Sequence, residues 1–152
     1  MSYSIGLDIS TSCTGWCIVS PGGSFVDMGY IPLGSKLSSY QKAQVMRERL
    51  SSLHITYDIT QVFIEENLQA FRPGFSSAKT LLTLARFNGI VGYLAQQEFF
   101  CEPMYINVNV ARKTVGLKVI SKKKGGEGCV RDIIEQTLRV TEKWNLDGKI
   151  KY

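Results

Sequence analysis

The chain has 152 residues, of which 44% are hydrophobic and 20% are charged, and this length and composition are typical of one globular domain with a sizeable core. We therefore expect a single domain over residues 1–152. The net charge of +5 and the pI of about 9.1 favour a polyanionic partner such as a nucleic acid. No apolar run reaches the roughly 18 residues of a membrane span, and no basic and apolar signal peptide opens the chain, so we expect no membrane association and a cytoplasmic location.

The stretch 4–19 is predicted to form a strand, a tight turn and a second strand. Alternate residues of the first strand are apolar, a second apolar run covers Trp16 to Val19, and small hydroxyl residues and Gly15 fill the turn. Asp8 breaks the pattern, because a carboxylate within an apolar strand is costly to bury unless it is paired or binds a metal. Asp8 can also stand at the strand end and accept hydrogen bonds from turn amides, and this stretch alone does not separate the two roles.

The next predicted elements are a strand over Phe25–Leu33, a helix over Tyr40–Leu53 and a strand over Gln61–Glu66. The last of these strands again delivers a carboxylate, Glu65, at the end of an apolar run. Two hydrophobic strands that each bring an acid to one sheet predict a divalent-cation site. Hard cations such as Mg²⁺ take oxygen ligands and keep several waters that phosphate substrates can replace.

The C-terminal half is predicted to contain alternating loops, helices and a strand. In order these are a loop over Asn67–Ser77, a long helix over Ala78–Phe99, a strand over Met104–Val108, and helices over Val110–Val115 and Val130–Trp144. Each glycine inside a helix costs about 1 kcal/mol relative to alanine, so Gly89 and Gly92 indicate close packing on the sheet or on a partner helix. The whole order predicts an α/β fold with a mixed five-stranded sheet flanked by helices.

The cysteines and the only histidine limit metal and nucleophilic chemistry. Cys13, Cys17, Cys101 and Cys129 include no Cys-x-x-Cys pair, so a zinc site is disfavoured and we interpret them as reduced thiols. His54 lies at a predicted helix end, where a solvated or capping role is favoured over catalysis.

Four motifs follow one another along almost the whole chain. They are Gly6-Leu7-Asp8-Ile9-Ser10 with Thr14-Gly15-Trp16, then Phe63-Ile64-Glu65-Glu66, then Ala85-Arg86-Phe87-Asn88-Gly89, and then Asn109-Val110-Ala111-Arg112-Lys113-Thr114-Val115-Gly116. Together they resemble RuvC-type Holliday junction resolvases of the RNase H-like superfamily. The resemblance implies an RNase H-like fold, a homodimer, and hydrolysis of branched DNA, in particular of four-way junctions, that depends on Mg²⁺ or Mn²⁺.

The resemblance also implies roles for the acidic residues. Asp8 and Glu65 would be the catalytic residues and metal ligands, with their carboxyl groups within about 6 Å of one another. Glu66 is the second choice as a ligand, because the next residue along a strand faces the other side. Two metal ions about 4 Å apart can activate water and stabilise the leaving oxygen of a phosphodiester.

One part of the family pattern is missing. The family places two further carboxylates, spaced as Asp-x-x-Asp, near the start of a C-terminal helix, and this sequence has no such pair. Asp132 and Glu135 have the spacing but are expected on a solvated helix face, and Asp147 lies in a predicted turn. We therefore expect the chain to end before the last acidic motif, with an incomplete metal site and weak or no activity.

Basic and aromatic residues supply the predicted DNA-binding surface. The basic residues are Arg112, Lys113, Lys118, Lys122, Lys123 and Lys124, and glycines follow them. A Lys–Gly-rich loop can follow a phosphate backbone, and the alternative is a solvated surface loop. Phe71 and Arg72 follow Glu65, where an aromatic loop can stack on unpaired bases at a branch point or can anchor itself to the core.

Two other interpretations remain open. The chain can be a non-catalytic DNA-binding relative that kept the fold and lost the metal. It can also be an actin-like domain that binds phosphate or ATP, which would need a second related domain for which 152 residues leave little room. Metal titration followed by cleavage of a four-way junction distinguishes the three. The residues do not tell a bacterial cell from a phage-infected host.

Overall fold

The structure is a computed structural model that describes residues 1–66 and 77–114, and the chain forms two compact units, Met1–Ile106 and Asn107–Tyr152. The elements of the first unit are β1 (Tyr3–Asp8), β2 (Cys13–Val19), β3 (Phe25–Pro32), α1 (Ser39–Thr56), β4 (Ile59–Glu65), α2 (Ala78–Phe99) and β5 (Met104–Ile106). The described part of the second unit contains α3 (Val108–Thr114). None of the described helices combines the length and the apolar character that crossing a bilayer requires.

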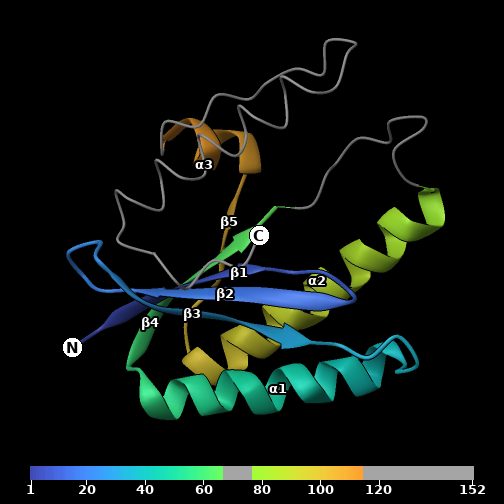
Figure 1. The fold of residues 1–152 in the computed structure, drawn as a ribbon, viewed down its shortest axis with the longest axis horizontal. Helices are drawn as coiled ribbons and strands as arrows, with labels where there is room; N and C mark the ends of the chain where they lie inside the picture. Colours follow the sequence, from blue (N-terminus) through green and yellow to red (C-terminus); the bar gives the residue numbers. More distant parts are fainter. Residues whose placement is uncertain (67–76, 115–152) are drawn as a thin grey trace. The chain divides into compact units, whose positions relative to one another are not determined.

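The five strands form one mixed sheet in the order β3-β2-β1-β4-β5. β2 runs antiparallel to both β1 and β3, and β4 runs parallel to both β1 and β5. This topology confirms the predicted mixed five-stranded sheet and the strand–turn–strand predicted over residues 4–19. Figure 1 shows α1 and α2 on the same side of the sheet.

The core lies between the sheet and these two helices. Alternate residues of the two central parallel strands are buried, as the pleat of a strand requires, and they are Ile5 and Leu7 on β1 and Val62 and Ile64 on β4. The helices contribute buried side chains that recur at helical spacing, namely Met46 and Leu50 from α1 and Phe87, Val91, Ala95 and Phe99 from α2. The opposite face of the sheet therefore carries the alternate, less buried residues.

The two glycines of α2 have different surroundings. A Cβ atom at Gly92 would meet the hydroxyl oxygen of Tyr105 and approach Ile64 Cδ1 to 3.7 Å, so Gly92 lets the helix pack closely on β4 and β5. This confirms the predicted close packing for Gly92. A Cβ atom at Gly89 would have no described atom within 4 Å, so the sheet gives no reason for that glycine, and packing of Gly89 on a partner helix stays a prediction.

Helix α1 is longer than its apolar pattern predicts. It begins at a capping box, in which Ser38 Oγ accepts a hydrogen bond from Gln41 N–H and Gln41 Oε1 accepts one from Ser38 N–H. It continues past Leu53 to Thr56, which places His54 in the last turn, so the predicted position at a helix end is confirmed, but the side chain contacts α2 instead of being solvated or capping the helix. The ring of His54 is half-buried, with Nδ1 3.2 Å from Glu98 Oε1 on α2.

Other element ends differ from the predicted ones by a few residues. β4 begins at Ile59, which pairs with Tyr3 on β1, and a register irregularity after this pair lets Ile59 join the same core as Val62 and Ile64. β5 ends at Ile106 and α3 begins at Val108, two residues before the predicted helix. The predicted helix over Val130–Trp144 and most of the predicted loop over Asn67–Ser77 lie outside the described residues.

A buried hydroxyl gives a prediction about stability. Thr14 on β2 is fully buried, and within the described ranges its Oγ1 has no hydrogen-bond partner. Because an unpartnered buried hydroxyl costs about 1–3 kcal/mol, Thr14→Val should raise the free energy of unfolding by about 1 kcal/mol. Calorimetry should then show a melting temperature about 2–4 °C higher. The exposed control Thr60→Val on β4 should change stability by less than about 0.5 kcal/mol, and a loss of stability in Thr14→Val would contradict the assignment.

Candidate metal centre

Asp8 and Glu65 are the last residues of two adjacent parallel strands, β1 and β4. The register pairs Leu7 with Ile64, so Asp8 and Glu65 occupy the next pair of positions along the two strands. Residues that face each other in a parallel sheet point to the same side, and both acids point away from the buried face that Leu7 and Ile64 share. Both side chains are exposed.

Two carboxylates at neighbouring positions repel each other unless a cation or a proton lies between them. Their oxygen atoms are the ligands that Mg²⁺ and Mn²⁺ prefer. Asp8 and Glu65 therefore fit a hard divalent cation at the carboxyl ends of β1 and β4. Across the residues that the structure describes, no three or more histidine, cysteine, aspartate or glutamate side chains lie together in a group that could hold a metal ion. The candidate metal ligands in this part of the chain are therefore the carboxylates of Asp8 and Glu65.

The end of β4 is fixed from two directions. Asn88 on α2 is 3% exposed, and its Nδ2 donates a hydrogen bond to the carbonyl oxygen of Glu65 at 3.3 Å. The backbone N–H of Glu66 donates to the carbonyl of Ile106 on β5 at 2.8 Å. Glu66 thus lies just beyond the last residue of β4, so strand alternation does not assign its side chain to a face.

Asn88 lies in one of the four motifs, but sequence reasoning assigned it no role, although a signal existed. Asn88 falls within the apolar stripe of α2, between Phe87 and Val91, where a polar side chain must find a partner when it is buried. Its partner is a backbone carbonyl on another element, and a sequence pattern does not identify such a partner.

A cysteine shares the face of the sheet that carries Asp8. Cys17 on β2 pairs with Gly6 on β1, two residues before Asp8. Burial, together with the negative charge of Asp27, raises the pKa of the Cys17 thiol above its ordinary value. The thiol is therefore protonated at neutral pH, and because metals bind the thiolate form, the chemistry of this face is that of the carboxylates.

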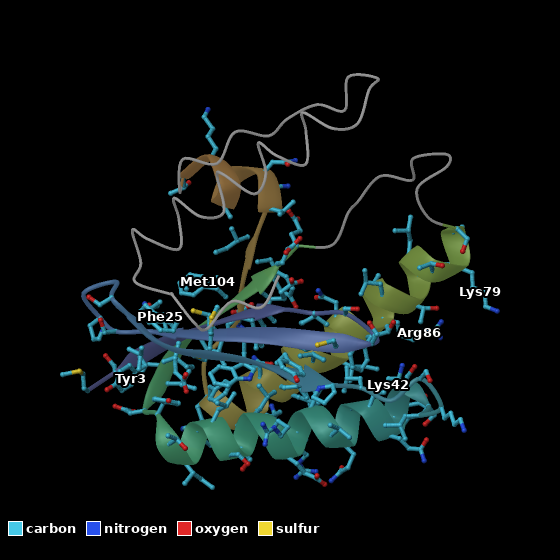
Figure 2. The ribbon with its side chains drawn as sticks, in the orientation of Figure 1. Tyr3, Phe25, Lys42, Lys79, Arg86 and Met104 are labelled. Carbon is cyan, nitrogen blue, oxygen red and sulfur yellow. The ribbon has the colours of Figure 1, made fainter. Side chains whose placement is uncertain are left out.

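The predicted DNA-binding residues are divided between described and undescribed parts of the chain. Arg112 and Lys113 lie on α3, and the side chain of Lys113 is exposed. Phe71, Arg72, Lys118, Lys122, Lys123 and Lys124 lie outside the described residues. The first unit carries further basic side chains that the sequence analysis did not select, and Figure 2 shows Lys42 on α1 and Lys79 and Arg86 on α2.

No protein-family model matches the sequence, and neither does any curated protein. Solved structures do match. Thermus thermophilus RuvC in complex with a Holliday junction substrate has 11% identity and a TM-score of 0.62, covering 94% of this chain and 96% of that one. A second T. thermophilus RuvC structure has 13% identity and a TM-score of 0.60, covering 91% and 79% of the two chains.

The yeast mitochondrial Holliday junction resolvase Ydc2 has 13% identity and a TM-score of 0.54, covering 99% of this chain and 70% of that one. At these identities the likeness shows the fold alone. The chain has the α/β, RNase H-like fold with a five-stranded mixed sheet, which confirms the predicted fold class.

Proposed function

We propose that the protein is a Holliday junction resolvase-like endonuclease, which hydrolyses phosphodiester bonds in branched DNA such as a four-way junction. The observation that carries the proposal is the neighbouring placement of Asp8 and Glu65 at the ends of β1 and β4. The fold that the chain shares with RuvC and Ydc2 supports the same activity. The net charge of +5 supports a polyanionic substrate.

Asp8 and Glu65 would hold the divalent cation, Mg²⁺ or Mn²⁺, with Glu66 as a second choice. Such an ion, when bound, supplies Lewis acidity at a phosphoryl oxygen and lowers the pKa of a bound water. The chain's own contribution is to keep two carboxylates in place before the substrate arrives. The bond from Asn88 to the Glu65 carbonyl and the pairing of β1 with β4 fix the backbone from which both acids project.

The test is cleavage of a synthetic four-way junction by the full chain with Mg²⁺ or Mn²⁺, with a chelator as the control. Because the sequence has no Asp-x-x-Asp pair to add to Asp8 and Glu65, we expect this cleavage to be weak. Even weak cleavage that requires the metal supports the proposal, and a matched linear duplex should be cut far more slowly. Junction binding without cleavage would favour the non-catalytic DNA-binding relative. Binding of ATP without binding of DNA would favour the actin-like alternative.

The proposed DNA contacts give a prediction about salt dependence. We propose that Arg112, Lys113, Lys118, Lys122, Lys123 and Lys124 bind phosphates, and that Phe71 and Arg72 lie beside unpaired bases. Each phosphate contact contributes about 0.9 to the slope of log affinity against log salt concentration. Replacement of Lys118, Lys122, Lys123 and Lys124 by glutamine should therefore reduce the magnitude of the slope by roughly 3.6. Fluorescence anisotropy with a labelled junction measures this, with the exposed Lys36→Gln as the control. An unchanged slope would identify these lysines as ordinary surface.

We also propose a homodimer that forms through α2. The side of α2 that faces away from the core is an exposed stripe, made of Ala78, Leu82, Ala85, Gly89, Tyr93 and Gln96. Leu82 and Tyr93 are 67% and 61% exposed, and Gly89 between them has open space where a Cβ would lie. A second copy packed on this stripe would cover both apolar side chains and would use the missing side chain of Gly89 for close approach.

Substitution of Gly89 tests whether the protein dimerises through α2. Gly89→Gln meets no described atom within the chain and has a better helix propensity, so it should not weaken the isolated fold. It should lower the mass measured by light scattering at tens of micromolar from that of a dimer to that of a monomer. Thr83→Gln, on another exposed side of α2, should leave the dimer intact. A wild-type monomer at that concentration would contradict the proposed dimer.

A further inference from the structure

The turn that follows Asp8 is held from outside the hairpin at two successive carbonyl groups. The carbonyl of Ser12 accepts a hydrogen bond from the backbone N–H of Leu33 at 2.9 Å. The carbonyl of Thr11 accepts one from the Nζ atom of Lys42 on α1 at 2.5 Å. The first hydrogen bond comes from the residue that follows β3 and the second from a side chain on α1, so both β3 and α1 hold the turn in place.

Lys42 differs from the other lysines that the structure describes. Its side chain is half-buried, whereas Lys36, Lys79 and Lys113 are exposed. An ammonium group that loses water needs a hydrogen-bond acceptor in exchange, and the Thr11 carbonyl is such an acceptor.

The helix itself gives no reason for this lysine. Lys42 lies near the N-terminal end of α1, where the helix dipole disfavours positive charge, and the first turn of α1 contains no acidic residue to offset it. Figure 2 shows Lys42 at this end of the helix. The interaction with the turn therefore explains the position better than helix stability does.

The tie has a direct consequence for Asp8. The chain leaves β1 at Asp8, buries Ile9 in the core and then enters the turn, so Thr11 is three residues from the acid. Asp8 also pairs with Gly15 across the hairpin that this turn closes. A shift of the turn would therefore move the backbone that follows Asp8 and the Gly15 position opposite it, and the exposed carboxylate would move with that backbone.

We propose that Lys42 is a positioning residue, which holds the β1–β2 turn so that the Asp8 carboxylate is fixed beside Glu65 for metal binding. This inference rests on the proposed function of the same site. Lys42 acts through the turn and does not touch the metal or the DNA in this scheme. Loss of a hydrogen bond made directly to a metal ligand typically lowers metal affinity by about 10- to 100-fold, and because Lys42 acts through the turn, we expect an effect near the lower end of that range.

The test uses the full chain and the metal alone. Electron paramagnetic resonance follows free Mn²⁺ during a titration of wild type, Lys42→Met, Lys42→Gln, Lys42→Arg and the control Lys36→Met. Methionine keeps the packing of the lysine stem and removes the charge and the donor, and arginine keeps both. Glutamine is a second variant in case methionine prevents folding, because it removes the charge and its amide nitrogen ends one atom short of the ammonium position. We expect Mn²⁺ affinity to fall at least about tenfold in the methionine and glutamine variants, to recover largely in Lys42→Arg, and to be unchanged in Lys36→Met.

Two further readouts separate positioning from the alternatives. Hydrogen exchange at the amides of Ser12 and Leu33 should accelerate in Lys42→Met while exchange in the core of β4 is unchanged. Junction affinity and its salt dependence should match wild type. A salt slope lower by about 0.9 in Lys42→Met would instead identify Lys42 as a phosphate contact and overturn the inference. Unchanged Mn²⁺ affinity in both removal variants would also overturn it, whereas absence of Mn²⁺ binding in wild type would overturn the proposed function itself.

Discussion

Replacement of Asp8 by asparagine is expected to lower metal-dependent cleavage of a four-way junction by at least about 100-fold. Asparagine keeps the size of the side chain and one oxygen, but it removes the negative charge that a hard cation requires. Loss of residues that merely support metal ligands costs about 10- to 100-fold, and a ligand itself should cost at least as much as the upper part of that range. Glu65→Gln should have an effect of similar size, because Glu65 occupies the neighbouring position on β4.

The binding of DNA should respond differently from its cleavage. Junction affinity should be unchanged or tighter in Asp8→Asn, because the substitution removes a negative charge that repels the phosphate backbone. Glu102→Gln is the matched control, since Glu102 is exposed and lies four residues before Ile106, the residue of β5 that pairs with Glu65. Gel-based cleavage rates and anisotropy measure the two properties separately. Full activity of Asp8→Asn would show that Asp8 is not a metal ligand.

Truncation of Phe87 should have the largest effect on stability. Phe87 on α2 is 1% exposed and is the largest of the fully buried side chains in the described part of the chain. Truncation of a buried phenylalanine to alanine typically costs about 3–5 kcal/mol, of a total stability of about 5–15 kcal/mol for a native protein. Urea unfolding followed by circular dichroism should show a lower midpoint with an unchanged slope.

A matched aromatic truncation controls for the loss of ring size. Tyr40 on α1 is 83% exposed, so Tyr40→Ala should change the free energy of unfolding by no more than about 0.5 kcal/mol. Phe87 adjoins Asn88, which holds the Glu65 carbonyl, so Phe87→Ala should also weaken Mn²⁺ binding under conditions in which the variant is folded. Equal stability of the two variants would contradict the assignment of Phe87 to the core.

The strands and the two acids were predictable from the sequence because their signals are local. Alternation along β1 and β4 identifies a buried face, and a carboxylate that follows the last apolar residue stands out within a few positions of the chain. The pairing of β1 with β4 was less accessible, because more than 50 residues separate Leu7 from Ile64 and loop closure leaves no local pattern. The register that makes Asp8 and Glu65 neighbours came from the structure.

The residues that support the site were missed for the same physical reason. Lys42 and Asn88 each bond to a backbone carbonyl on a distant segment, and every residue offers such a carbonyl. The contact of His54 with Glu98 on α2 is likewise absent from the sequence prediction, because 44 residues separate the two side chains. Side-chain contacts between elements depend on packing, and packing is set by the whole core rather than by any short stretch.

The central claim, that Asp8 and Glu65 form one metal site, is tested most directly by a double-mutant cycle on Mn²⁺ affinity. The cycle compares wild type, Asp8→Asn, Glu65→Gln and the double variant by titration with Mn²⁺ alone. If both carboxylates bind the same ion, the second substitution should cost much less than the first, giving strong non-additivity. Strictly additive losses, or Mn²⁺ affinity that neither substitution changes, would contradict the shared site.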